Sequence, residues 1–337
     1  MRVLFLGGTG TISTACVRIA LDQGFEVYVL NRGQSLRRPI DPRARQIVGD
    51  AYNDTDLLDA VTKNKIDVVA DFICFDGPSA ERMVSLLAGK VSQYLFIATA
   101  SAYQKPVHKH PITESTPLSR IGLSGYSQKK IDAEDVFTSS YLTKNFPVVI
   151  VRPSHTYDDA IPPLVGDWTA WDRILKGKPV FVSGDGTNPW TLTHADDFAV
   201  GFVGLIGNFA AVGEAIHIVS NESPTWEDIY STIGSVVGVK PIVLKLTAEQ
   251  IRILEPDWFW SEQILGDLSH TAIFDTQKLK RFVPAFNPVV TWPEGVRRLH
   301  AWYQKNSSRV TLDSQMNEKL DRICASHAKI VELLKTH

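Results

Sequence analysis

The chain has 337 residues, of which 44% are hydrophobic and 21% charged, as in an ordinary globular protein. Its formal net charge of −2 gives no electrostatic case for nucleic acid or an anionic membrane as the main partner. The three cysteines include no Cys-x-x-Cys pair and no apolar stretch approaches a membrane span, so we expect a cytoplasmic protein without disulfides or structural zinc.

Short apolar runs alternate with helical patterns through the first half of the chain. The apolar runs predict strands over residues 3–6, 27–30, 47–48, 68–73, 94–98 and 148–152. The helical patterns cover residues 11–23, 57–61, 80–87 and 129–141. Nearly continuous apolar strands separated by helices are typical of a parallel sheet covered on both faces. With right-handed crossovers, this order predicts an α/β fold of the doubly wound (Rossmann) type.

A glycine-rich turn joins the first predicted strand to the first predicted helix, with the sequence Gly7-Gly8-Thr9-Gly10-Thr11-Ile12-Ser13. We expect Gly7 and Gly8 to adopt positive φ, and Gly10 to leave room for a pyrophosphate. Ser13 replaces the usual third glycine and is small enough for close packing. The start of the helix offers free N–H groups to an anion, so Thr11 and Ile12 are also expected cofactor contacts. The competing interpretation is an ordinary strand-to-helix turn.

The second predicted strand ends in Asn31-Arg32-Gly33, where an NAD-binding fold usually presents an acid to the adenosine ribose. In place of that acid, Arg32 is suited to the 2′-phosphate of NADP, with Arg37 and Arg38 nearby. We therefore expect NADP, with NAD as the alternative, and take Asn31 and Arg32 as cofactor contacts. Asp50, after the third strand, is expected to bind the adenine amino group. The competing interpretation of Arg32 is a solvated loop charge.

Tyr126 and Lys130 have the Tyr-x-x-x-Lys spacing at the start of a helical pattern, which places both side chains on one helix face. A phenol with a pKa of about 10 acts as a base at neutral pH only when its phenolate is stabilised, and a nearby ammonium does this. Thr99 ends the fifth predicted strand, at the edge where open α/β sheets bind ligands. We expect Thr99 to hydrogen-bond a substrate oxygen, with Ser101 as its rival. Tyr103 is expected to line the substrate site or to belong to the core.

The chain resembles the extended short-chain dehydrogenases/reductases, the NAD(P)-dependent nucleotide-sugar epimerases and dehydratases, in segments 7–13, 99–103, 126–130, 151–153, 193–197 and 275–278. This resemblance implies that Tyr126 is the catalytic acid/base, Lys130 its cationic partner and Thr99 the hydroxyl at the substrate oxygen. It also implies that Phe72 lies beside the cofactor and that Pro153 and His155 line the nicotinamide. A homodimer is a further expectation inherited from the family.

Beyond residue 155 the pattern is less regular, with prolines between helical patterns at 197–206, 226–237, 247–254 and 292–305. We interpret this part as a smaller, mixed α/β substrate-binding lobe, in which the apolar run 215–219 is a candidate strand of the first sheet. The expected domains are a dinucleotide-binding domain over residues 1–155, mainly the substrate lobe over 156–310, and a C-terminal helix within 311–337. The candidate apolar contacts of that helix are Leu320, Ile323, Ile330, Leu333 and Leu334.

Two departures from the family pattern bear on the substrate. Trp190 stands where the nucleotide-sugar enzymes often have an arginine that grips the diphosphate, which puts a nucleotide-sugar substrate in doubt. Ala100 and Ser101 follow Thr99 where dehydratases commonly have an Asp-Glu pair, which argues against 4,6-dehydration. We expect substrate contacts from Ser101, Tyr103 and Trp190, and no metal site.

Three interpretations of function follow from these motifs. The leading one is an epimerase-like oxidoreductase that acts by hydride transfer on a hydroxyl or ketone of a sugar-like small molecule. The second is an NADP-dependent ketone or aldehyde reductase that uses the same residues. The third is a non-catalytic nucleotide- or RNA-binding relative of the chloroplast stem-loop-binding type, which the intact Tyr126/Lys130 pair and the near-neutral charge disfavour.

Overall fold

A parallel sheet of seven strands forms the centre of the molecule in the computed structural model, which describes residues 1–34, 38–119 and 125–335. The strand order is β10-β6-β5-β4-β1-β2-β3, and every neighbouring pair is parallel. The strands are β1 (Arg2–Leu6), β2 (Glu26–Asn31), β3 (Arg45–Val48), β4 (Val68–Asp71), β5 (Gln93–Ile97), β6 (Val148–Pro153) and β10 (Ala215–Ile218). This order confirms the predicted doubly wound fold, and β10 shows that the run 215–219 does return to the first sheet.

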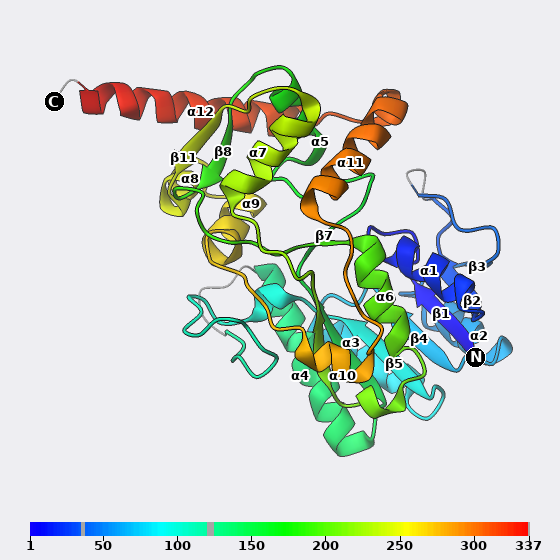
Figure 1. The fold of residues 1–337 in the computed structure, drawn as a ribbon. Coiled ribbons are helices and arrows are strands. Elements are labelled where there is room, and N and C mark those ends of the chain that lie inside the picture. The colour runs from blue at the N-terminus through cyan, green and yellow to red at the C-terminus, as the bar shows by residue number, and fades with distance from the viewer. Residues whose placement is uncertain (35–37, 120–124, 336–337) are drawn as a thin grey trace.

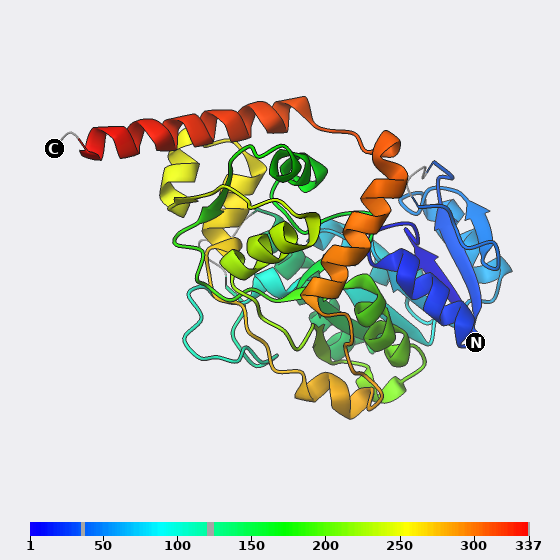
Figure 2. The ribbon, with the colours of Figure 1, turned by 45° about the horizontal axis from the view of Figure 1, so that its top comes forward.

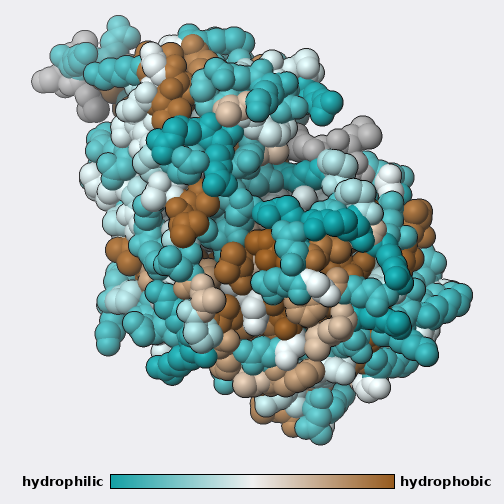
Figure 3. Space-filling model, turned by 45° about the vertical axis from the view of Figure 1, so that its right-hand side comes forward, coloured by the Kyte–Doolittle hydropathy of each residue, from teal (hydrophilic) through white to brown (hydrophobic). Residues whose placement is uncertain are grey.

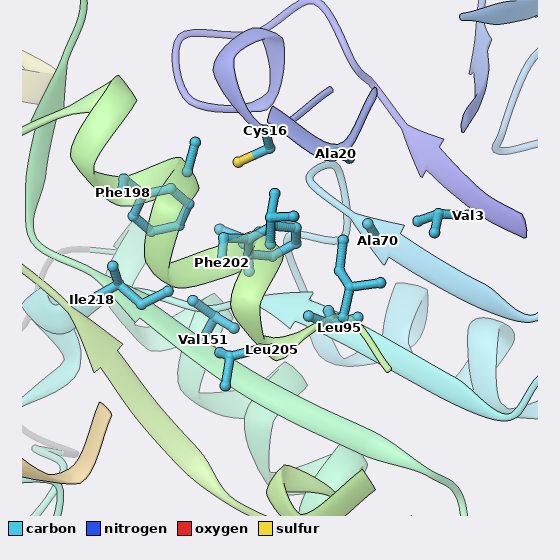
Figure 4. Close-up of a cluster of buried hydrophobic side chains, with 14 of the residues drawn as sticks. Val3, Cys16, Ala20, Ala70, Leu95, Val151, Phe198, Phe202, Leu205 and Ile218 are labelled. Atoms are coloured by element: carbon cyan, nitrogen blue, oxygen red, sulfur yellow. The ribbon is translucent and has the colours of Figure 1, made fainter. Parts of the chain in front are cut away.

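Helices cover both faces of this sheet (Figure 1). The helices α1 (Ser13–Asp22) and α6 (Ala195–Leu205) pack on one face, and α2 (Asp54–Lys63), α3 (Gly77–Leu87) and α4 (Gly125–Lys144) on the other. Figure 4 shows the first interface, in which Phe198 and Phe202 of α6 point between α1 and the strands.

The two-sided cover explains why the strands are apolar at consecutive positions. Val3 and Phe5 of β1 join the core beneath α1 and α6, whereas Leu4 and Leu6 join the core beneath α2, α3 and α4. Successive side chains of a strand point to opposite faces, so a strand with helices on both sides needs an apolar residue at every position.

A second lobe is built from two small parallel sheets and most of the remaining helices, whereas α10 (Gln277–Phe282) packs on the core of the first sheet through Leu279. Its paired strands are β7 (His155–Tyr157) with β9 (Leu192–His194), and β8 (Val180–Ser183) with β11 (Val243–Leu246). The helices after β7, apart from α6, are α5 (Asp167–Leu175), α7 (Trp226–Val237), α8 (Ala248–Leu254), α9 (Phe259–Gln263), α10 (Gln277–Phe282), α11 (Trp292–Asn306) and α12 (Ser314–Lys335). Shorter helical turns are η1 (Ala100–Ala102), η2 (Phe209–Ala211), the π-helical η3 (Ile264–Leu268) and η4 (Ser307–Arg309). The division of the chain at residue 155 remains a proposal.

The C-terminal helix α12 projects from the second lobe, at the opposite end of the molecule from the N-terminus (Figures 1 and 2). Leu320 and Ile323 are buried against the lobe, as the sequence predicted. Leu333 is 63% exposed, so the prediction of a buried contact there was wrong, because the helix extends beyond the body. The side chain of Leu334 lies outside the described residues.

The surface is mostly hydrophilic. Figure 3 shows one face of the molecule, on which apolar side chains gather toward the middle and hydrophilic ones surround them. Among the described residues, no helix has both the length and the apolar character needed to cross a membrane.

Candidate active site

The glycine-rich turn after β1 is shaped by close packing. Gly7 has a φ of +90°, and a Cβ there would lie 2.6 Å from Cγ2 of Ile73. Gly8 does not have positive φ, contrary to our expectation; it is needed because a Cβ would lie 2.9 Å from Cγ1 of Val29. Gly10 is the open member of the turn, since its Cβ would approach only Oγ of Ser13, at 3.2 Å.

Ser13 holds this turn closed. Its Oγ accepts a 2.8 Å hydrogen bond from the N–H of Gly10 and donates a 3.1 Å hydrogen bond to the carbonyl of Gly7. The sequence interpretation credited Ser13 only with small size. The N–H groups of Thr11 and Ile12, at the start of α1, have no acceptor among the described residues. The side chain of Ile12 packs against the core, so the group that it offers to a ligand is its backbone N–H.

A cavity of about 410 Å³ lies beside the turn and unites the residues expected at the adenosine end of a dinucleotide. Its lining includes Gly7, Asn31, Arg32, Asp50 and Tyr52. Oδ1 of Asn31 accepts hydrogen bonds of 3.0 Å from the N–H of Gly33 and from Nε2 of Gln46, which fixes the loop. Arg32 is exposed, and no described group pairs with its guanidinium. Sequence reasoning missed Tyr52, whose hydroxyl donates a 2.6 Å hydrogen bond to the carbonyl of Ile73.

Arg38 is held away from this cavity. Its guanidinium makes a two-point contact with the carboxylate of Asp158, at 2.6 and 3.0 Å, so Arg38 is not a second group at the adenosine ribose as we had expected. Both side chains are largely buried, and they line a further cavity of about 330 Å³ with Thr11. Arg37 lies outside the described residues.

Tyr126 and Thr99 meet at the carboxyl end of β5. The Tyr126 side chain, in the first turn of α4, lies close to the hydroxyl of Thr99, and both residues line one cavity. Thr99 Oγ1 lies 2.9 Å from Oγ of Ser101, which lies 2.7 Å from Oγ of Ser127. Burial raises the pKa of the Tyr126 phenol, and the nearby hydroxyl of Thr99 opposes that rise. Ser127 is the member of this hydroxyl chain that sequence reasoning missed, although it follows Tyr126 directly.

Lys130 lies one helical turn further along α4 and is 2% exposed. Its ammonium donates hydrogen bonds of 2.7 Å to the carbonyls of Cys74 and Ile97. An ammonium has three N–H donors, and no described group accepts the third. Burial lowers the pKa of Lys130 to about 8, while the nearby charge of Asp71 opposes this shift.

A cavity of about 250 Å³ opens beside Tyr126. From the sequence-predicted set it collects Thr99, Ser101, Tyr126, Pro153, His155 and Trp190. Its far wall comes from residues that sequence reasoning did not select: Lys105, Phe259, Trp260, Gln263, Asp267 and Phe274. Four of them come from the consecutive elements α9 and η3, and Lys105 and Phe274 come from distant segments, so no motif in the sequence connects them to Tyr126.

Two predicted contacts lie elsewhere. Tyr103 is fully buried, and its hydroxyl lies 3.1 Å from both Nδ1 of His217 and Nη1 of Arg152, so it is part of the core and not a substrate contact. Phe72 is partly buried beside the glycine-rich turn, with its ring 6.1 Å from that of Phe5, and lines neither the adenosine cavity nor the one beside Tyr126.

His155 and Trp190 are joined on the wall of the cavity beside Tyr126. The indole N–H of Trp190 donates a 3.0 Å hydrogen bond to Nδ1 of His155. Burial lowers the pKa of His155 to about 4, so the ring is neutral at neutral pH and carries its proton on Nε2. The Trp190 ring also stacks on Trp226, with centroids 5.7 Å apart.

The chain has relatives among known proteins. The family model of the NAD dependent epimerase/dehydratase family matches residues 3–219. The chain is 26% identical over 303 residues to the 2′-dehydrokanamycin reductase of Streptomyces kanamyceticus, covering 85% of this chain and 80% of that protein. It is 25% identical over 261 residues to the chloroplast stem-loop binding protein of 41 kDa b from Arabidopsis thaliana, covering 70% of this chain and 63% of that protein.

A solved structure with a similar fold is the UDP-glucuronic acid 4-epimerase of Bacillus cereus in complex with UDP-glucuronic acid and NAD. The two folds superpose with a TM-score of 0.74 at 20% identity, over 90% of this chain and 99% of that one. At this identity the likeness speaks for the fold alone.

Proposed function

The chain belongs to the NAD dependent epimerase/dehydratase family, as its motifs predicted, and from this we propose that it is an NAD(P)-dependent oxidoreductase of a sugar-like ring. The family is NAD-dependent, and the curated relatives are mainly epimerases, with a dehydratase and a reductase among them. The chain is therefore an enzyme of this NAD-dependent class. The preference for NADP, the substrate, and the roles of individual residues belong to the proposal.

The residues around the turn suit a dinucleotide. The N–H groups of Thr11 and Ile12 lie at the positive end of α1 and have no acceptor among the described residues. A pyrophosphate needs such free donors. Arg32 and Asp50 line the adenosine cavity, whereas Lys130 is buried outside both cavities with its ammonium 4.5 Å from the centroid of the Phe75 ring, so its contact with a ribose hydroxyl requires that ring to move. The bound nicotinamide would supply a hydride in reduction and accept one in oxidation.

The carrying observation is that Tyr126 and Thr99 lie close together on the wall of one cavity, with Lys130 one turn along the same helix as Tyr126. In the proposed reduction, Thr99 orients the ketone oxygen and Tyr126 donates the proton that this oxygen gains. Burial raises the pKa of Tyr126, contrary to the lowering by Lys130 that the sequence predicted, so the phenol carries its proton at neutral pH and is a weaker acid than a free phenol. Reduction uses one hydride and one proton for each ketone, and Tyr126 regains its proton from solvent.

Reduction is the direction that we favour. The reductase from Streptomyces kanamyceticus aligns over most of both chains, and by its name it reduces 2′-dehydrokanamycin. We propose that this chain likewise acts on the ketone, or the corresponding alcohol, of a sugar-like ring.

Epimerisation is the second candidate, and one contact favours it. The Arg38–Asp158 ion pair joins the loop after β2 to the second lobe beside Thr11, where it hinders departure of a dinucleotide. An epimerase regenerates its cofactor in each turnover and therefore gains from retaining it.

Turnover assays decide between these activities. The purified protein is mixed with NADP or NAD and a panel of sugar-like alcohols, and the absorbance of the reduced nicotinamide is followed. Stoichiometric formation of reduced cofactor and ketone supports the oxidoreductase. Conversion of an alcohol to its epimer without net cofactor change supports epimerisation. A protein that binds neither dinucleotide refutes both.

A further inference from the structure

One short segment of the second lobe builds the far wall of the cavity beside Tyr126. Helix α9 and the π-helical turn η3 that follows it contribute the lining residues Phe259, Trp260, Gln263, Asp267 and Leu268. π-Helical turns are rare and are frequent at functional sites, because they re-aim side chains that an α-helix would place elsewhere.

The charges in this wall cancel. Lys105 Nζ lies 2.6 Å from Oδ1 of Asp267, and both side chains are largely buried. The neutral ring of His155 adds no charge, so the described lining carries no surplus positive charge for a diphosphate. Moving Lys105 toward a phosphate would leave the carboxylate of Asp267 buried without its partner, which is unfavourable.

The part of the cavity lined by Trp190 also offers no charged group to a ligand. Trp190 is 4% exposed and is fixed by its hydrogen bond to His155 and its stacking on Trp226. Besides Tyr126 and His155, the remaining aromatic lining residues are Phe259, Trp260 and Phe274. Aromatic faces pack well against the C–H faces of a sugar ring, and they give a phosphate neither charge nor hydrogen bonds.

Gln263 supplies an unused polar group in this apolar setting. The residue is 8% exposed, and its Nε2 is buried with no hydrogen-bond partner among the described residues. Its Oε1 also accepts no hydrogen bond from any described group. Gln263 lines the cavity. A buried amide without partners is costly and rare, and its presence on a cavity wall points to a ligand that completes it.

We propose that this pocket selects a polyhydroxylated ring without phosphate, and that the side-chain amide of Gln263 hydrogen-bonds a hydroxyl or amino group of that ring. The inference rests on the proposed function, which it narrows from sugar-like molecules in general to those that lack a nucleotide. Gln263 would thus be a specificity-determining residue.

Calorimetry on the cofactor-loaded protein tests the substrate class without requiring turnover. Three probes are used. Kanamycin is an amino-bearing polyol without phosphate, sucrose is a neutral polyol without phosphate, and UDP-glucose carries a diphosphate. We expect kanamycin or sucrose to bind and UDP-glucose to bind more weakly. The inference is overturned if UDP-glucose binds more tightly than the phosphate-free probes, or if neither phosphate-free probe binds. Dinucleotide-dependent turnover of UDP-glucose would still support the proposed oxidoreductase.

The role of Gln263 is tested by Gln263→Met, which keeps side-chain length and removes the amide. We expect the Kd or KM for the phosphate-free probe that binds to rise about twofold to tenfold, the worth of one neutral hydrogen bond. The kcat and the cofactor Kd stay unchanged, and Tm stays the same or rises because an unsatisfied amide is lost. The matched control is Gln315→Met, an exposed position on α12, which should change nothing. Unchanged affinity in Gln263→Met overturns its assigned role.

Discussion

The ammonium of Lys130 on α4 donates a 2.7 Å hydrogen bond to the carbonyl of Ile97, at the end of β5. This contact anchors the helix that bears Tyr126 to the strand that precedes Thr99. It thereby fixes the relative position of the two groups that we place at the substrate oxygen.

The affinity for the dinucleotide should depend on pH through Lys130. Burial lowers the pKa of this lysine to about 8, so the free protein loses the ammonium as the pH rises through about 8. Because the charged form is the better ribose donor, we expect cofactor affinity to fall as the pH rises through that value. Calorimetric titration on either side of it measures the change. In Lys130→Met, affinity should be low and independent of pH; a variant with wild-type pH dependence assigns the titration to another group.

Removal of the Tyr126 hydroxyl should abolish most of the activity while sparing the fold. We expect Tyr126→Phe to lower kcat by about 10²–10⁴-fold, the usual worth of a positioned general acid or base, with an unchanged Tm. Thr99→Val should also lower kcat with little change in Tm.

Tyr103→Phe is the matched control, because it removes the same atom from a buried site. It removes one partner of Arg152 Nη1 and one of His217 Nδ1, while Arg152 keeps its ion pair with Glu134 and His217 its contact with the carbonyl of Asp275, so we expect a loss of about 1 kcal/mol in the free energy of unfolding. The kcat of the folded variant should be retained. A Tyr126→Phe protein with full activity on its substrate would remove Tyr126 from the mechanism.

A side chain at Gly10 should be compatible with the fold and should prevent binding of the cofactor. A Cβ there lies 3.2 Å from Oγ of Ser13, a tight contact with a single side-chain atom, so Gly10→Val should still fold, with a modest fall in Tm. Its methyl groups should then occupy the space of the pyrophosphate and prevent dinucleotide binding, and Gly10→Ala should show an intermediate loss. Calorimetry and thermal unfolding provide the two readouts. A stable Gly10→Val protein with wild-type affinity contradicts this placement.

Arg32 should distinguish NADP from NAD. A charge-assisted hydrogen bond to the 2′-phosphate contributes about 1.5–3 kcal/mol, so Arg32→Ala should weaken NADP binding by roughly tenfold to a hundredfold. The affinity for NAD should not change, because NAD lacks that phosphate. Wild-type protein that binds NAD more tightly than NADP would overturn the preference expected from the loop.

Arg38 should control how quickly the cofactor leaves. Arg38→Ala removes both contacts with Asp158, and we expect the dissociation rate of the dinucleotide to increase. Stopped-flow displacement of bound cofactor measures that rate, and Asp158→Asn provides the reciprocal variant. Equal release rates in wild type and both variants would show that the ion pair serves only the fold.

Local sequence was sufficient for the sheet and for the residues that flank its carboxyl edge. Strand and helix periodicity is a property of neighbouring residues, so β1 through β6 and the helices between them follow from apolar spacing alone. The spacing of Tyr126 and Lys130 is equally local. Their joint approach to Thr99 follows once parallel strands are assumed, because such strands end at one edge of the sheet.

Tertiary packing decided the rest of the site. Tyr103 has a side chain suited to a substrate contact and follows the strand that leads to Thr99. Its hydroxyl is nevertheless buried against His217, 114 positions later in the chain. Lys105 pairs with Asp267 across 162 positions, and Arg38 with Asp158 across 120. The sequence by itself determined the fold and the placement of the Tyr126–Lys130 pair, whose signals span a few residues. Only the docking of the second lobe on the sheet determined the charge balance and the far wall of the pocket, because no local pattern encodes contacts between segments so far apart.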